Sequence, residues 1–252
     1  MIKATYFIGF MLVVFSLDSC KDKKSHDVDD VPQKEIELLL RPTFGSQHIV
    51  LDSVYMLNDG TLVKLTDFKV YFSHIIANGT ELSAVSLYNF TENGTSIFRG
   101  VKNESNASSI TFSLGVLPSL NHNDPSTFPS NHPLSILVAN DMHWDWNPGY
   151  IFYKIEGKAD TLVDGTTNLN HSFSFHIGMD QNLTSKTISG LSWSNATENL
   201  EQAWLKWDMQ QFFDNPAQPL DLKTIYTSHS MPGEEASTNL VKSNFLESIS
   251  AL

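Results

Sequence analysis

The chain has 252 residues, of which 41% are hydrophobic and 17% are charged, a balance that supports a packed core and excludes global disorder. Its formal net charge of −12 argues against nucleic acid as a partner, because phosphates require a basic protein surface. The single cysteine excludes a disulfide framework and a cysteine-rich zinc site.

The first 19 residues predict a bacterial lipoprotein signal peptide. Residues 6–17 carry no charge, and this run is too short to span a bilayer but suits the apolar region of a signal peptide. The sequence LDSC at 17–20 resembles the lipobox, in which the cysteine is lipidated and becomes the first mature residue. We therefore expect a lipid anchor on Cys20 that holds the protein at the bacterial outer membrane or cell surface. The periplasmic face of the membrane is an alternative location. The alternative is an ordinary secretory signal with a chance cysteine.

Residues 20–34 are mostly charged or polar and carry almost no large apolar side chain. Such a composition cannot form a core, and it is typical of a flexible segment. We interpret this segment as a tether that holds the folded domain away from the membrane.

From residue 35 onward, apolar residues recur at every second position, most clearly at 36–40, 68–72, 110–114, 151–155 and 173–177. This period predicts half-buried antiparallel strands. Asn-Gly and Asp-Gly pairs between the runs indicate turns. The pattern predicts an all-β fold, an antiparallel β-sandwich with long loops, and the spacing of Leu240, Phe245 and Ile249 adds a short C-terminal helix. With no internal repeat and no linker, 35–252 is expected to be a single domain.

The stretch 118–140 contains four prolines among polar residues and is expected to be a long irregular loop. Loops of this length in compact domains are often functional. The usual catalytic signatures are missing from the sequence, including G-x-S-x-G, H-E-x-x-H and a glycine-rich phosphate loop. We therefore predict a binding protein and not an enzyme.

The densest cluster of chemically distinctive side chains is MHWDWNPGY at 142–150, followed by FSFHIG at 173–178. Here the chain resembles the MbnP family, copper-binding proteins of the periplasm or cell surface first associated with methanobactin gene clusters. The resemblance also rests on LLLRPTFG at 38–45, LTDFKVYFS at 65–73 and EG at 156–157, and it covers most of residues 35–215. Its most specific part is the Trp-x-Trp-x-x-Gly-Tyr piece followed by His-Ile-Gly.

The resemblance implies a β-rich domain that binds copper through imidazole. In characterised relatives a tryptophan oxidised to kynurenine helps to form the site, and a dihaem peroxidase-like partner performs the oxidation. His176 matches the family histidine, and Trp144 and Trp146 match the paired tryptophans, either of which is open to the modification. An outer-membrane transporter is a further possible partner.

The residues themselves agree with a metal site, because neutral imidazole suits copper and zinc and thioether selects Cu(I). The two-residue period places His176 on the polar face of its strand. The alternative is that His176 is a solvent-exposed histidine that binds no metal. We expect His143 to be the second ligand, because it directly precedes the tryptophan pair. Asp145 is a candidate acceptor that orients a ligating imidazole.

Other histidines and Met142 are weaker candidates. We expect His74 to be a core residue, His122 and His132 to lie on the loop surface, and Met142 to be an apolar plug and not a ligand.

Two competing functions stay open. One is a metal-free surface lipoprotein that binds a glycan, a peptide or a partner protein, and the other is a redox-active copper enzyme.

Overall fold

The computed structural model describes residues 34–252 except 91–94, 102–106, 145–148 and 163. The predicted signal peptide at 1–19, Cys20, and the tether up to residue 33 lie outside the described residues, as do Asp145 and Trp146. Within the described part, no helix is both long and apolar enough to cross a membrane.

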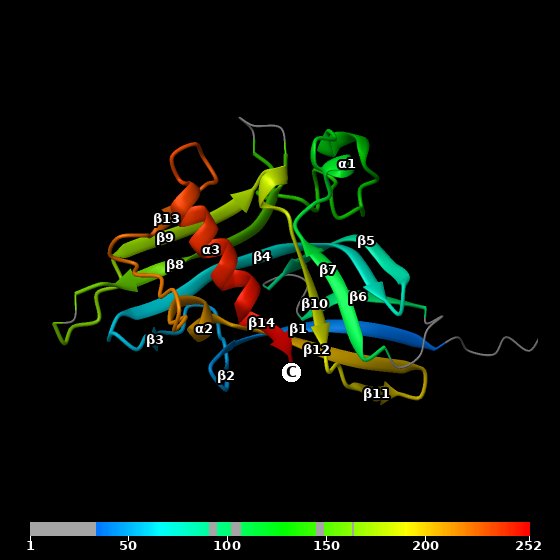
Figure 1. Cartoon of the computed structure of the whole chain (residues 1–252), viewed down its shortest axis with the longest axis horizontal. Coiled ribbons are helices and arrows are strands. Elements are labelled where there is room, and N and C mark those ends of the chain that lie inside the picture. The colour runs from blue at the N-terminus through cyan, green and yellow to red at the C-terminus, as the bar shows by residue number, and fades with distance from the viewer. Residues whose placement is uncertain (1–33, 91–94, 102–106, 145–148, 163) are drawn as a thin grey trace, which may run out of the picture. The chain divides into compact units, whose positions relative to one another are not determined.

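Two mixed sheets form the framework of the described chain (Figure 1). The smaller sheet has six strands, with β11, β12, β1 and β2 in spatial order, β14 paired to β12, and β6 paired to β1. Their bounds are β1 (Glu35–Phe44), β2 (Gln47–His48), β6 (Ser96–Val101), β11 (Trp193–Thr197), β12 (Leu200–Asp208) and β14 (Ile249–Ala251).

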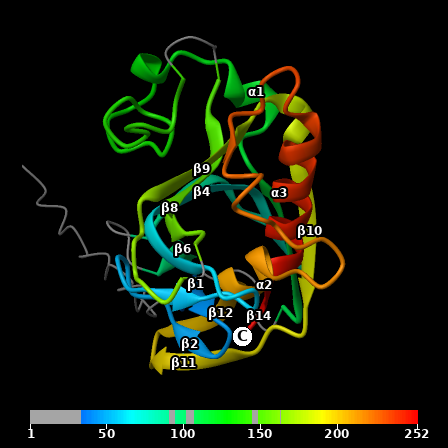
Figure 2. The same cartoon turned by 90° about the vertical axis from the view of Figure 1, so that its left-hand side faces the viewer.

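The larger sheet has eight strands, with β10, β7, β4, β8, β9 and β13 in spatial order, and with β3 and β5 paired to β4. It curls as a half-barrel (Figure 2). Its strands are β3 (Tyr55–Met56), β4 (Leu62–Ala77), β5 (Thr80–Asn89), β7 (Ser109–Leu114), β8 (Ile151–Asp160), β9 (His171–Gly178), β10 (Thr184–Ser189) and β13 (Thr227–Ser228). The helices are α1 (Pro118–Asn121), α2 (Met209–Phe213), α3 (Glu235–Ser248) and the 3-10 turns η1 (Pro125–Thr127) and η2 (Asp180–Asn182).

The mostly β fold and the C-terminal helix are confirmed, and the five predicted runs lie within β1, β4, β7, β8 and β9. The prediction of a purely antiparallel sandwich is wrong, because β1 pairs with β12 in parallel and β13 pairs with β9 in parallel. Alternation of apolar side chains is the same in either strand direction, so the period could not distinguish the two pairings.

The core lies where the two sheets and α3 meet. The ring of Phe68 on β4 stacks on Trp207 of β12 with centroids 4.2 Å apart, and Phe245 of α3 packs against both rings and against Tyr153. Burying a side chain such as Phe68 stabilises the fold by about 1.5–3 kcal/mol. The helix therefore closes the space between the sheets.

His74 is not in this core. The strand pairing between β4 and β7 is irregular between Ser73 and Ile76, and His74 has a φ of 50°. This bulge turns the imidazole outward, where 48% of the side chain is exposed. The expectation of a core histidine is therefore wrong, because a one-residue irregularity reverses the face that period two assigns.

The loop predicted at 118–140 is irregular apart from the short turns α1 and η1, and it packs on the outer face of the larger sheet. The Tyr71 hydroxyl donates a hydrogen bond of 3.0 Å to the carbonyl of Pro133, and the Tyr150 hydroxyl donates one of 2.6 Å to the carbonyl of Leu134. The loop thus shields from water a sheet face that the sequence pattern makes polar.

Candidate metal site

Two rows of polar side chains cross the outer face of the larger sheet. Strand register places Lys69, Lys154 and His176 side by side in one row and Asp67, Glu156, Ser174 and Thr227 in the next. The opposite face carries the core residues Phe68, Ile155 and Phe175. The prediction that His176 lies on the polar face with Ser174 is confirmed.

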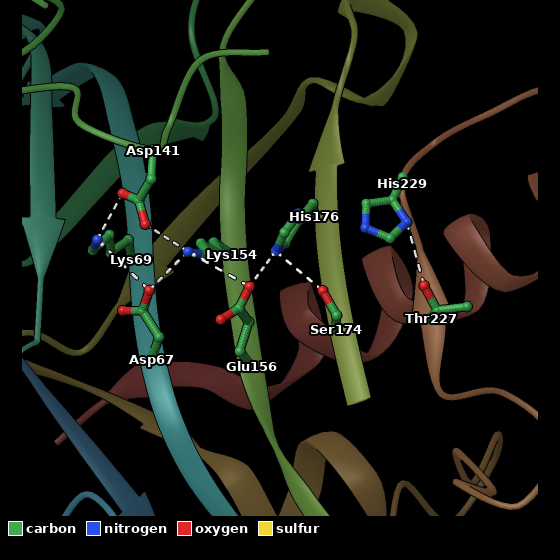
Figure 3. Close-up of polar contacts among 9 residues, drawn as sticks. All are labelled: Asp67, Lys69, Asp141, Lys154, Glu156, Ser174, His176, Thr227 and His229. Atoms are coloured by element: carbon green, nitrogen blue, oxygen red, sulfur yellow. Dashed lines mark hydrogen bonds and ion pairs between the residues drawn. The ribbon is translucent and has the colours of Figure 1, made fainter. Parts of the chain in front are cut away.

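His176 is held by hydrogen bonds and is not a solvent-exposed bystander, since only 17% of its side chain is exposed. Its Nε2 lies 2.7 Å from Oε1 of Glu156 and 3.1 Å from Oγ of Ser174 (Figure 3). The hydrogen bond from His176, aided by the charge of Lys154, holds the pKa of Glu156 below its usual value against the effect of burial. Glu156 is therefore an ionised acceptor that orients the imidazole.

A second imidazole stands against His176. The ring of His229 lies with its centroid 4.9 Å from that of His176, at an interplanar angle of 86°. Its Nδ1 is 3.3 Å from Oγ1 of Thr227, and its backbone N–H donates to Glu234 at 2.7 Å. Burial, together with the neighbouring His176, lowers the pKa of His229, which keeps this ring in the neutral form that binds metals.

A cluster of charges connects His176 to the covering loop. Asp141, directly after the 118–140 loop, accepts from Lys69 at 2.7 Å and from Lys154 at 2.6 Å (Figure 3). Lys154 also lies 3.0 Å from Asp67 and 3.5 Å from Glu156. Burial opposes the charge of Lys154, but hydrogen bonds to Asp141 and Asp67 outweigh it and raise the pKa of Lys154. The chain at Asp141 is thereby tied to β4 and β8, and through Lys154 and Glu156 to His176.

Trp144 reaches the same strand. The Cβ that an alanine would place at Gly178 would lie 2.5 Å from Cη2 of Trp144, and Gly178 is two positions beyond His176, hence on the same strand face. The indole is 6% exposed. The glycine of the His-Ile-Gly sequence thus gives the tryptophan room to pack against the strand that carries His176.

The other histidines and the methionine named from the sequence contact residues other than His176. His143 forms an isolated bridge with Tyr150, and their rings are 5.0 Å apart. His122 contacts Asp180 at 3.0 Å, His132 stacks on Phe128 with centroids 4.5 Å apart, and Met142 is completely buried. The pairing of His143 with His176 stays a prediction, whereas Met142 has the burial expected of an apolar plug.

Among the described residues, no three or more His, Cys, Asp or Glu side chains are grouped to hold a metal ion. What this part of the chain does provide is a pair of imidazoles with oriented nitrogens. Sequence reasoning missed His229 because no motif surrounds it. The role of Glu156 could have been predicted from the sequence, since Glu156 is part of the Glu-Gly pair in the family resemblance and shares a strand face with Lys154.

These features define a mostly β protein with paired imidazoles and a packed tryptophan on a covered sheet face. The family model described as MbnP matches residues 33–231, and the chain therefore belongs to the MbnP family. The solved structure of MbnP from Methylosinus trichosporium is similar to this chain, with 12% identity and a TM-score of 0.48, covering 73% of this chain and 78% of that one. Comparison with curated proteins gives no match.

Proposed function

We propose that this protein binds copper at the His176–His229 pair and acts in metal capture, storage or handover and not in catalysis. The observation that carries the proposal is the contact between the two imidazoles, each with one nitrogen already held by an oxygen. Membership of the MbnP family supports copper as the metal.

The residues present fit the metal. A ligating histidine normally donates its second N–H to a carboxylate or another oxygen, which fixes the tautomer. Glu156 takes this role toward Nε2 of His176, and Thr227 toward Nδ1 of His229. The nitrogens offered to copper are then Nδ1 of His176 and Nε2 of His229.

Trp144 packs near the pair along the same strand. Its buried indole lies over Gly178, two residues beyond His176. We propose that Trp144 or Trp146 is the tryptophan open to oxidation to kynurenine, by a dihaem peroxidase-like partner. Attachment through a lipid on Cys20, at the outer membrane or cell surface, would keep the protein near an outer-membrane transporter.

A second function has a specific observation in its favour. Ile136, Leu137 and Val138 of the covering loop are 64%, 71% and 37% exposed. Consecutive exposed apolar residues are typical of contact surfaces. A metal-free lipoprotein that binds a peptide, a glycan or a partner protein would use this loop.

Titration of the purified protein with Cu(I) and Cu(II) against a competing chelator separates the two functions. We expect saturable binding of copper that displaces the chelator. Zn²⁺ and Mg²⁺ serve as comparison ions, because imidazole tolerates zinc whereas magnesium prefers oxygen ligands. Absence of copper binding in folded protein would reject the proposal and favour the contact-surface function.

A further inference from the structure

A cavity of about 290 Å³ lies between η2 and the beginning of α3, and both Met179 and Met231 line it. Met179 follows His176 by three residues, and Met231 follows His229 by two. The two chain segments are joined here, because the backbone N–H of Gly178 donates a hydrogen bond of 3.2 Å to Oγ of Ser230. The cavity is therefore a neighbour of the imidazole pair.

Of the two methionines that line this cavity, Met231 is 38% exposed and Met179 is partly buried. Met142 and Met209 are completely buried in the core, and Met56 is 63% exposed on β3. Nε2 of Gln181, which also lines the cavity, lies 3.5 Å from Sδ of Met179. This contact places the Met179 sulfur next to a polar side chain of the cavity wall, while the Met179 side chain also packs against the core.

The backbone at the cavity adopts left-handed conformations that side chains rarely take. Met179 has a φ of 69°, and Ser230, directly before Met231, has a φ of 58°. Such conformations are costly for residues other than glycine and concentrate at ligand-binding positions. Both turns place a methionine on the wall of the same cavity.

We propose that this cavity binds Cu(I) through the thioethers of Met179 and Met231. Thioether sulfur is a soft ligand that selects Cu(I) and needs no deprotonation. The two ionisable side chains on the wall, Glu235 and Lys242, have opposite formal charges, so the wall has no net formal charge and the choice of metal rests on the soft thioethers. Binding of Cu(I) here is independent of the imidazoles, whereas handover to His176 and His229 rests on the proposed function.

The test uses the full processed protein labelled with methyl-¹³C methionine, titrated with Ag(I) as a redox-inert substitute for Cu(I). We expect the methyl resonances of Met179 and Met231 to shift together and to saturate, while those of Met56, Met142 and Met209 stay in place. Resonances are assigned with Met→Leu variants, which keep the side-chain volume and fold well. An absent response, or an equal response at exposed Met56, would overturn the proposal.

Two variants complete the test. In Met179→Leu, the remaining Met231 resonance should lose most of its Ag(I) response, whereas Met56→Leu should leave it unchanged. In His176→Ala, the responses of both methionines should persist even though copper binding at the imidazole pair is lost. Persistence of the Met231 response in Met179→Leu would contradict a shared site, and loss of both responses in His176→Ala would contradict an independent one.

Discussion

Gly178 and Trp144 are in contact at a distance that only glycine allows. A Cβ at position 178 would lie 2.5 Å from Cη2 and 2.7 Å from Cζ3 of the indole, and 2.7 Å from the carbonyl oxygen of Tyr150. The carbonyl belongs to backbone and cannot move aside freely. The tryptophan segment and the His-Ile-Gly strand therefore depend on each other for their packing.

Gly178→Ala should accordingly destabilise the protein by about 1–3 kcal/mol, the usual cost of overpacking a tight contact. The indole must move, so the tryptophan fluorescence of the folded variant should also change. Urea unfolding followed by fluorescence and by circular dichroism measures both effects. Ser172→Ala, at an exposed position of the same strand, is the control, and equal stability of Gly178→Ala and this control would contradict the contact.

Glu156→Gln should weaken copper binding by about 10–100-fold, the range found when an acceptor behind a ligating histidine is lost. The amide keeps the shape of the side chain but removes the charge that holds Nε2 of His176. A competition titration measures the affinity, with Glu37→Gln on β1 as a control for the lost charge. Unchanged affinity in a folded Glu156→Gln variant would show that His176 does not need this partner to bind metal.

Asp141→Asn should lower stability at neutral pH and make it less sensitive to acid. Burial alone would raise the pKa of Asp141, but hydrogen bonds from Lys154 and Lys69 outweigh it and lower the pKa below its ordinary 3.8. A carboxylate with a lowered folded pKa contributes stability that is complete above the ordinary pKa and is lost as pH falls through the folded value.

The difference in melting temperature between wild type and Asp141→Asn should therefore be largest near pH 7 and shrink below about pH 4. Asp52→Asn is the matched control, because Asp52 forms an exposed pair with Lys64 at 2.7 Å. Exposed pairs contribute little, so this variant should resemble wild type throughout. A difference for Asp141→Asn that is the same at all pH values would contradict the ion-pair account.

Cys20→Ala should abolish acylation and either release the protein from the membrane fraction or stall its processing. The expectation follows from the lipobox-like LDSC sequence at 17–20. Cell fractionation with intact mass spectrometry measures it, and the same mass spectrum reports oxidation of a tryptophan to kynurenine. A variant that is processed and membrane-bound like wild type would reject the lipid anchor.

Much of the fold was predictable because the longer strands of the larger sheet alternate apolar side chains with mostly polar ones. The alternation around Phe173 and Phe175 predicted the orientation of His176, and the structure confirms it. The parallel pairing of β1 with β12 was not predictable, since the two strands are far apart in the sequence and alternation carries no direction.

The site was predictable only in part. His229 follows β13, a strand of two residues whose pairing with β9 has no periodic signal, so nothing in the sequence connected His229 to His176. The placement of Trp144 beside the strand of His176 agrees with the resemblance, because glycine at 178 permits the approach. The left-handed backbone at Met179 and Ser230 occurs at residue types that do not usually adopt it. The methionine cavity was therefore not predictable from the sequence.

The most direct test of the central claim is the copper affinity of wild type, His176→Ala, His229→Ala, His143→Ala and His132→Ala, each first shown to be folded by circular dichroism. We expect loss of His176 or His229 to weaken copper binding by more than about 100-fold, because losing a ligand costs more affinity than losing the group that orients it. His132→Ala should bind like wild type, because this ring stacks on Phe128 in the loop. The His143→Ala arm tests the second ligand predicted from sequence. Wild-type affinity in both His176→Ala and His229→Ala would contradict the copper site proposed here.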